Sequence, residues 1–541
     1  MLERLARSRG GWIGLALLGL ASRLAVACRD LDALDRLFIP DDTYYLLGIA
    51  RSLARGLGPT ADGVTLTSGF QPLLVFLQTP LFWLLDGTDP PLRATLLGLG
   101  VLDVAVALLL GRIVVRVAGP VSGWLSAAAW LTLPQAMRLA MGGLETTLAL
   151  LMTLAVVELW SRYRERDGAR PALGLGVAIG LALLARVDTV FLVGLLGLYE
   201  LVLGDRRRLA GVVATSALVV APWWIYCALV FGSVVPESGP AARELALLYQ
   251  GPQVHWTALR WSGLMGLFPI DLDLLELRGR VWIPAGAALL GSWLLWSLYA
   301  LLGARLLGRL PAVSRVPVVT LFLHAGIQAV FYVAYVPVVW FFVRYLCVTQ
   351  VCLCILFGIG AVHLTRSPVL RRSVWALASI WLVVAGARTA AFLFLTADLP
   401  PRWTVEGASG YRVPAREALA TLPEGAVVGA LQTGALGYFA PEGVQVVNLD
   451  GVVDGRAAAA LASYRLLSYA RERGVEYFCD WPLQHHMFQE RAGAPVRFRQ
   501  LWRARRSQQS GHVLTLSAVL PPDEGAGGSP SGGAPARAGS S

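Results

Sequence analysis

Long apolar runs are the feature that most constrains this chain. Several of them exceed about 18 residues, the length of helix that crosses a hydrocarbon core of roughly 30 Å. Lipid offers no hydrogen-bond partners, so each run must satisfy its backbone internally, which favours helices. Charged residues make up 15% of the 541 residues, against about 25% in a soluble protein. We therefore expect an α-helical polytopic membrane protein, which excludes a soluble globule, a disordered chain and a disulfide scaffold. The eleven predicted spans are residues 11–28, 92–117, 121–141, 144–160, 171–187, 188–204, 209–231, 281–303, 317–340, 343–363 and 374–397.

The arginines between these runs predict the topology. All 46 basic residues are Arg, and the positive-inside rule places their clusters on the cytoplasmic side. A twelfth apolar run, residues 71–85, would move five of six clusters outward if it crossed, so we predict an interfacial or re-entrant segment there. The N-terminus is then cytoplasmic and the C-terminal part extracytoplasmic, in a plasma (inner) membrane. Residues 1–28 also resemble a lipoprotein signal, which would leave this orientation unchanged. The clusters are Arg4/Arg7/Arg9, Arg112/Arg116, Arg162/Arg164/Arg166/Arg170, Arg206/Arg207/Arg208, Arg305/Arg309/Arg315 and Arg366/Arg371/Arg372.

Three larger pieces lie outside in this topology. Two are loops, residues 29–91 and 232–280, that belong to a transmembrane domain of residues 1–397. The third is the C-terminal part, where alternating strand and helix patterns predict an α/β domain over residues 398–520. Residues 521–541 are rich in Gly, Pro and Ser and are expected to be disordered. The predicted strands are 426–431, 444–449, 475–479 and 512–520, and one helical run, 456–473, is expected to stop at Gly474.

The first outer loop carries the most informative chemistry. Asp41 and Asp42 follow Pro40 and begin an amphipathic segment whose apolar face suits the membrane surface. Arg51 and Arg55 on this segment are expected to meet anionic lipid. One aspartate could simply cap the helix. Alternatively, a carboxylate at the bilayer edge could act as a base towards a lipid-borne substrate. The residue chemistry alone leaves both readings open.

A series of short motifs resembles one family of membrane enzymes, the C-type (GT-C) glycosyltransferases. These polytopic enzymes use polyprenyl-phosphate sugars on the outer face of the membrane. Each motif is weak alone, and their order along nearly the whole chain carries the resemblance. Glu237 departs from the Asn that is usual in this family. The tail motifs resemble the bacterial arabinofuranosyltransferase/mannosyltransferase-like branch. The motifs are Pro40–Tyr45, Thr67–Leu73, Gly143–Thr146, Leu184–Asp188, Phe231–Pro236, Arg344–Leu346, Gly434–Phe439 and Val447–Gly451.

The resemblance implies a transferase mechanism and a set of site residues. The donor already has a phosphate leaving group, so one base suffices, and inversion is expected without the second carboxylic acid of glycoside hydrolysis. The family's acidic residue carries over to Asp41, with Asp42 second. Arginine suits the departing phosphate because its planar fork binds two oxygens, which favours Arg344 and then Arg186. An ion pair between Arg186 and Asp188 is the alternative. The residues expected to orient substrate are Glu145, Tyr44 and Gln71.

No cofactor is certain. A divalent cation is possible at Asp271 and Asp273, because carboxylate oxygens bind such ions, although this spacing is common in ordinary loops. The expected partners are a polyprenyl-phosphate-linked sugar, an extracytoplasmic glycan, lipid or protein acceptor, and membrane lipid. Nucleic acid is excluded, because the basic residues are spread over membrane loops without interleaved aromatics.

Other polar residues have structural readings beside functional ones. Asp103 lies within a span, where a carboxylate is a functional candidate, yet a hydrogen bond to a neighbouring helix is the favoured reading. His324 and Gln328 share one helix face and are expected to serve packing. His485 and His486 are expected to be a surface pair. Two other functions remain alternatives, a transporter or lipid flippase and a non-catalytic scaffold with an outer binding domain.

Overall fold

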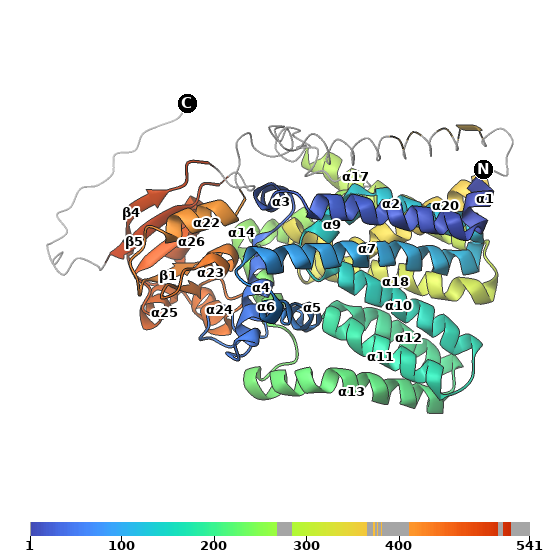
Figure 1. Ribbon diagram of the computed structural model, residues 1–541, viewed down its shortest axis with the longest axis horizontal. Coiled ribbons are helices and arrows are strands. Elements are labelled where there is room, and N and C mark those ends of the chain that lie inside the picture. Colours follow the sequence, from blue (N-terminus) through green and yellow to red (C-terminus); the bar gives the residue numbers. More distant parts are fainter. Residues whose placement is uncertain are drawn as a thin grey trace.

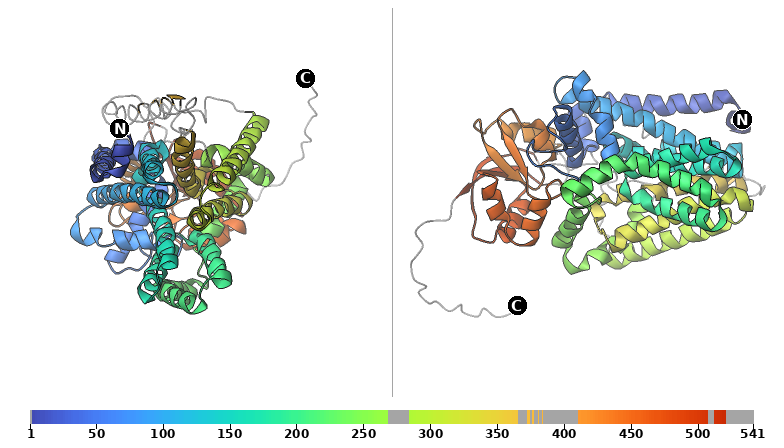
Figure 2. Two further views of the ribbon diagram at one scale, coloured as in Figure 1. Left: turned by 90° about the vertical axis from the view of Figure 1, so that its right-hand side faces the viewer. Right: turned by 90° about the horizontal axis from the view of Figure 1, so that it is seen from below.

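The computed structural model describes residues 2–267, 284–364, 410–506 and 512–520, with a few isolated residues between 372 and 383. A bundle of helices and a smaller α/β domain lie end to end along the long axis of the molecule (Figure 1). The N-terminal helix lies at the end of the bundle that is remote from the α/β domain (Figures 1 and 2). Apart from three isolated residues, the predicted span 374–397 falls outside the described residues, as does the tail 521–541.

The bundle is built from apolar helices. Among the described residues, six are long and apolar enough to cross a membrane, or seven if one pair bent by 112° counts as a single span. Three predicted spans form shorter helices, α8, α11 and α12, of 13, 17 and 14 residues. The number of spans therefore stays a prediction. The helices are α1 (Leu2–Arg7), α2 (Arg9–Ala27), α7 (Asp89–Ala118), α8 (Pro120–Thr132), α9 (Pro134–Met141), α10 (Thr146–Glu165), α11 (Ala169–Ala185), α12 (Val190–Leu203), α13 (Arg206–Phe231), α17 (Ala285–Leu307), α18 (Ala312–Ala334) and α20 (Cys347–Leu364).

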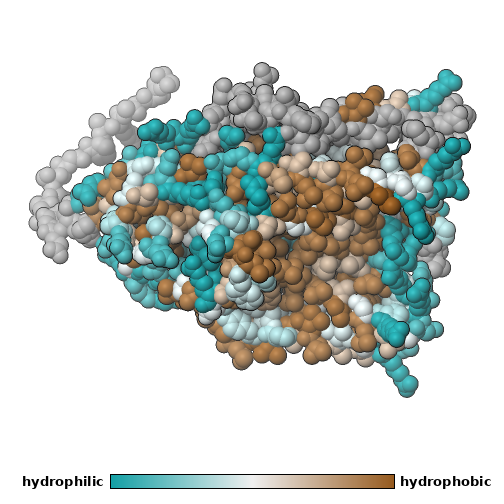
Figure 3. All heavy atoms as spheres, viewed as in Figure 1, coloured by the Kyte–Doolittle hydropathy of each residue, from teal (hydrophilic) through white to brown (hydrophobic). Residues whose placement is uncertain are grey.

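The surface of the bundle is that of a multi-pass membrane protein. Figure 3 shows a hydrophobic band over the helices, with hydrophilic residues at the far end and on the α/β domain. Large apolar side chains of the helices are exposed, such as Leu218, Leu229 and Trp293. Exposed apolar surface of this extent would be unfavourable in water, and lipid is the solvent that fits it.

Short helices join the bundle to the α/β domain. Residues 71–85 form α5 and α6, of seven and four residues, and neither is long enough to cross a bilayer. The predicted amphipathic segment begins at Asp41 as expected, forms α4, and packs against α23 of the α/β domain. The junction helices are α3 (Leu31–Leu37), α4 (Asp41–Ala54), α5 (Pro72–Gln78), α6 (Leu81–Leu84), η1 (Val187–Thr189), α14 (Ser238–Gln250), η2 (Gly251–Gln253), α15 (Val254–Gly266), η3 (Val339–Phe341) and α19 (Phe342–Tyr345).

The α/β domain contains a five-stranded sheet in the order β2-β1-β3-β5-β4. The first three strands pair in parallel, and β5 joins β3 and β4 antiparallel. The four predicted strands are present, whereas β4 was missed because its alternation is obscured by arginines. Its elements are α22 (Arg412–Leu419), β1 (Val427–Ala430), α23 (Gly434–Phe439), β2 (Gln445–Asn448), α24 (Gly455–Ala462), α25 (Leu466–Glu472), β3 (Tyr477–Asp480), α26 (Pro482–Arg491), β4 (Arg497–Arg503) and β5 (Thr515–Leu520).

The predicted single helix over 456–473 is wrong. The chain breaks into α24 and α25 at Tyr464, whose φ of 56° is left-handed and cannot continue a right-handed helix. Gly474, with φ of 72°, ends the second helix as expected, because glycine adopts this conformation without a Cβ penalty.

Candidate active site

The two aspartates at the start of α4 have different partners. The residue that precedes the helix is Pro40, in extended conformation and without a side-chain cap, so neither aspartate occupies the N-cap position of α4. Asp41 instead accepts hydrogen bonds from the backbone N–H groups of Gly434 and Ala435, each at 2.8 Å. These are the first residues of α23, so Asp41 caps a helix of the other domain.

Burial dominates the electrostatics of Asp41. Its exposed fraction is 4%, and desolvation raises its pKa to about 7, against the two N–H bonds that favour the charged form. Asp450 and Asp480 lie near it in the α/β domain, and burial raises their pKa values to about 8 and about 7. Three buried carboxyl groups thus face the junction from both domains.

Asp42 is the more accessible of the pair. Its Oδ2 lies 2.7 Å from Nη1 of Arg344, and the exposed side-chain fractions are 29% for Asp42 and 18% for Arg344. The guanidinium of Arg344 also packs over the ring of Phe341 at 4.6 Å. Its buried Nε has no partner among the described residues. Arg344 therefore keeps hydrogen-bonding capacity for a further anion.

A second arginine lies at the centre of a buried network. Arg186 donates through Nη1 to Oε1 of Glu145 at 2.7 Å, through Nη2 to Oδ2 of Asp188 at 2.9 Å, and to the hydroxyl of Tyr332 at 2.8 Å. Tyr332 and Gln328 in turn donate to Asp188. The alternative partner proposed for Arg186, Asp188, is thus present, and Glu145 is a second one.

One aromatic side chain links the two arginines. The ring of Tyr345 stacks on that of Tyr332, with centroids 4.2 Å apart. The guanidinium carbon of Arg186 lies 5.3 Å from the Tyr345 centroid, and that of Arg344 lies 5.8 Å from it. Such cation–π contacts hold both cations beside one ring. The predicted residues Asp42, Arg344, Arg186 and Glu145 therefore form one connected group.

The remaining predicted residues lie around this group or away from it. The side-chain oxygen of Gln71 accepts the N–H of Val187, next to Arg186, at 3.2 Å. Tyr44 is fully buried and donates to Asp35 at 2.7 Å. Asp271 and Asp273 lie outside the described residues. Within the part of the chain that is described, no group of three or more His, Cys, Asp or Glu residues could hold a metal ion.

Sequence reasoning missed several residues that complete the site. Tyr332 gave no signal, because it occurs in an apolar run where aromatics usually pack. Tyr345 lies in the Arg344–Leu346 motif, but no role was predicted for it. Tyr45 accepts hydrogen bonds from the backbone and side chain of Thr433 and from Asn448. Asn448 belongs to a motif that was singled out, yet its partner lies some 400 positions earlier, as only the tertiary structure reveals.

Three other predicted roles have definite outcomes. The prediction that Arg51 meets lipid is wrong, since it donates to the backbone oxygens of Gly437 and Tyr438. The favoured reading of Asp103 is confirmed: it accepts from Arg23 at 2.9 Å and from Trp130 at 2.9 Å. The predicted surface pair of histidines is half wrong, because His485 is half-buried whereas His486 is exposed.

His324 and Gln328 differ in their surroundings. Gln328 donates to Asp188 at 2.8 Å, so it belongs to the network around Arg186. His324 is fully buried, and neither ring nitrogen has a hydrogen-bond partner among the described residues. The packing prediction therefore describes His324 better than Gln328.

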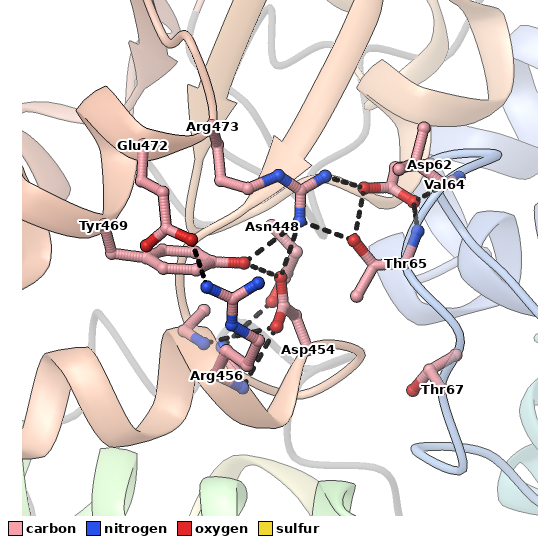
Figure 4. A network of polar contacts seen from close by, with 12 residues as sticks. Asp62, Val64, Thr65, Thr67, Asn448, Asp454, Arg456, Tyr469, Glu472 and Arg473 are labelled. Carbon is pink, nitrogen blue, oxygen red and sulfur yellow. Dashed lines mark hydrogen bonds and ion pairs between the residues drawn. The ribbon is translucent and has the colours of Figure 1, made fainter. Parts of the chain in front are cut away.

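A further polar network joins the loop between α4 and α5 to the α/β domain (Figure 4). Arg473 lies at its centre and donates to Asp62 at 2.7 Å, with Thr65 and Tyr469 as further partners. Asp454 lies 3.5 Å from the same guanidinium. Glu237, the departure from the family pattern, accepts from the Thr67 side chain and the Ser68 backbone of this loop. The Arg473 network holds this loop against the α/β domain, and the hydrogen bonds to Glu237 hold it against the segment that precedes α14.

Comparison with known proteins identifies the fold. No family model matches the chain, and no curated protein matches it. Among solved structures, ArnT from Cupriavidus metallidurans in the apo state matches with a TM-score of 0.52 at 14% identity, covering 94% of this chain and 98% of that one. The archaeal oligosaccharyltransferase AglB from Archaeoglobus fulgidus, in complex with an inhibitory peptide and a dolichol-phosphate, matches with a TM-score of 0.52 at 14% identity. That match covers 89% of this chain and 71% of AglB.

The chain has the GT-C fold. The likeness extends over both the bundle and the α/β domain, since it covers most of the chain. At this identity it establishes the fold alone. The chemistry has to be argued from the site.

The helical bundle also contains an apolar groove. It is an open cavity of about 500 Å³ between α10, α11, α12 and α13. Its lining is almost entirely hydrophobic and includes Leu183, Gly197 and Trp224. Leu183 precedes Arg186 by three residues on the same chain segment, so the groove approaches the network around Arg186.

Proposed function

We propose that this protein is an inverting glycosyltransferase that moves a sugar from a polyprenyl-phosphate donor to an extracytoplasmic acceptor. The observation that carries this proposal is the ion pair between Asp42 and Arg344, half-open and adjacent to the buried Arg186 network. A carboxylate and two arginines at the edge of an apolar bundle are the groups that such a reaction requires. The neighbour AglB, solved with a dolichol-phosphate, supports a lipid-linked donor.

The topology of the proposal follows the arginine clusters. Eleven spans, a cytoplasmic N-terminus and an extracytoplasmic α/β domain place Asp42 at the outer face of the plasma membrane. The six to seven long helices among the described residues, and the shorter apolar ones, support a multi-pass arrangement. The acceptor is then a glycan, lipid or protein of the cell envelope, and the sugar is a hexose or a pentose.

Arg344 and Arg186 are proposed to stabilise the phosphate. During transfer the bond between the anomeric carbon and the phosphate oxygen breaks, and the leaving polyprenyl phosphate gains negative charge. Preorganised cations at that point stabilise the transition state more than the ground state. The side chain of Arg344 is 18% exposed, and its Nε has no partner among the described residues, so Arg344 is the primary ligand. Arg186 is held in place by Glu145 and Asp188 and is proposed to supply a second, fixed cation near Arg344.

Asp42 is proposed to act as the base. It takes the proton of the acceptor hydroxyl while that oxygen attacks the anomeric carbon from the face opposite the phosphate. Asp41 is less suited, because both of its carboxylate oxygens already accept backbone N–H groups and it is almost inaccessible. Binding of the donor phosphate to Arg344 would weaken the pull of that arginine on Asp42. The base is thereby freed when the donor is in place.

The polyprenyl chain is proposed to occupy the apolar groove between α10 and α13. The groove is hydrophobic and open, and its lining includes Leu183, three residues before Arg186, which fits a phosphate head with an isoprenoid tail. A divalent cation is retained as a possible component, with no step assigned to it.

The test is release of free polyprenyl phosphate. Purified protein in lipid vesicles is given a panel of polyprenyl-phosphate sugars and an envelope acceptor extract, with Mg²⁺, with Mn²⁺ and with a chelator. Wild type is compared with Asp42→Asn and with Asp32→Asn, a matched exposed carboxylate on α3. Release that Asp42→Asn abolishes, with folding intact and the control active, supports the transferase. Absence of release from any donor would refute it.

A further inference from the structure

We propose that the α/β domain positions the base, with Asp41 acting as a positioning residue that holds the first turn of α4 against α23. This inference rests on the proposed function, since it assigns the base to Asp42. It gives the C-terminal domain a role inside the reaction instead of a role in acceptor binding. The contacts between α4 and α23 carry the inference.

One face of α4 is bonded to α23 along its length. Residues 41, 44, 45, 48 and 51 recur at the spacing of a single helix face. Asp41 accepts two backbone N–H bonds at the start of α23. The ring of Tyr44 packs against Phe439 at 5.2 Å, and the guanidinium of Arg51 lies 5.0 Å from the ring of Tyr438. The α/β domain thus fixes both the rotation of α4 about its axis and its position along that axis.

The position of Asp42 follows from this attachment. Asp42 is the next residue in the same turn and points to Arg344 on the membrane side. It has no other partner that would orient it among the described residues. A rotation of the first turn would carry Asp42 away from Arg344, and a misplacement of about 1 Å in a reacting group lowers rates by about 10²-fold.

Glycine at position 434 makes the close approach possible. A Cβ added there would lie 2.1 Å from the backbone oxygen of Asp41 and 2.8 Å from its Oδ2. Both distances are too short for a carbon atom, and the first involves backbone that cannot turn aside. Gly437 on the same helix offers a contrast, because its added Cβ would meet only the oxygen of Ala61 at 3.7 Å.

The test compares two matched pairs of variants, Gly434→Ala with Gly437→Ala and Asp41→Asn with Asp42→Asn. We expect Gly434→Ala to lower kcat by about 10²-fold and to change the KM for the donor little, because Arg344 and Arg186 are untouched. Gly437→Ala should remain near wild type. Asp41→Asn keeps one acceptor oxygen for α23 and should retain a measurable kcat, whereas Asp42→Asn should lose about 10²–10⁴-fold.

A readout independent of activity separates this inference from the proposed function. Hydrogen exchange of the α4 amides should be faster in Gly434→Ala than in Gly437→Ala. If neither the wild type nor any variant releases polyprenyl phosphate, the proposed function is wrong. Equal hydrogen exchange of the α4 amides in the two glycine variants would show that α23 does not hold α4. Wild-type kcat in Gly434→Ala, or an Asp41→Asn variant as inactive as Asp42→Asn, would overturn the positioning role.

Discussion

The buried ion pair between Arg23 and Asp103 permits a quantitative prediction. Both side chains are fully buried between α2, α7 and α8. Arg23 donates through Nε to Asp103 at 2.9 Å and through Nη1 to the backbone oxygen of Leu131 at 2.7 Å. Asp103→Asn would leave the Arg23 charge without a counter-ion in the apolar bundle. Breaking a buried pair in this way costs about 3–5 kcal/mol, so we expect a loss of stability of that size.

A double variant tests the physical reason. Arg23→Met combined with Asp103→Asn removes both charges and keeps an acceptor for the indole N–H of Trp130, which lies 2.9 Å from Asp103. The double variant should regain at least half of the stability that Asp103→Asn loses, because no unpaired charge remains. Unfolding by SDS in mixed micelles, followed by loss of helical circular dichroism, measures both.

Two results would refute this reasoning. One is an Asp103→Asn protein that unfolds at the same SDS fraction as wild type. The other is a stable, folded Asp103→Asn protein without transferase activity, which would give the intramembrane carboxylate a part in the reaction.

Three further predictions concern the groove, the domain junction and pH. Gly197 lines the apolar groove and Gly194 does not, and an added Cβ would meet no atom within 4 Å at either position. Gly197→Phe should therefore raise the KM for a long-chain donor, whereas Gly194→Phe should not. The same KM in both variants would contradict the assignment of the groove to the polyprenyl chain. Arg473→Met removes the cation that pairs with the buried carboxylates of Asp62 and Asp454, so the thermal midpoint of unfolding should fall. Arg456→Met removes an exposed ion pair with Glu472 and should change the midpoint little. Equal midpoints in the two variants would contradict this prediction. Burial raises the pKa of Asp35, Asp41, Asp450 and Asp480 from 3.8 to about 7 or 8. Their contribution to stability is therefore present at low pH and lost as pH rises from about 4 to about 8. The thermal midpoint should fall across this window, less steeply in Asp450→Asn, and a midpoint that rises with pH would contradict this prediction.

Local patterns predicted much of the architecture. Apolar runs bounded by arginines indicated the bundle, because the bilayer imposes a length and a side on each helix. Alternating short strands indicated the α/β domain. The break at Tyr464 was missed, since both halves of the run have helical propensity and only a left-handed residue separates them. Strand β4 was missed because Arg497, Arg499 and Arg503 place charge on a solvent-facing edge.

The sequence by itself determined which residue types were available for the site, namely two adjacent aspartates and arginines at the ends of apolar runs. Their order along the chain indicated a common face of the membrane. It could not distinguish Asp41 from Asp42, because neighbouring residues in a helix point in directions about 100° apart and meet different partners. Only the tertiary structure brought Gly434 to Asp41 and Arg344 to Asp42, across some 390 and 300 positions of sequence. Burial and charge at each carboxylate are consequences of those distant contacts, which no local pattern contains.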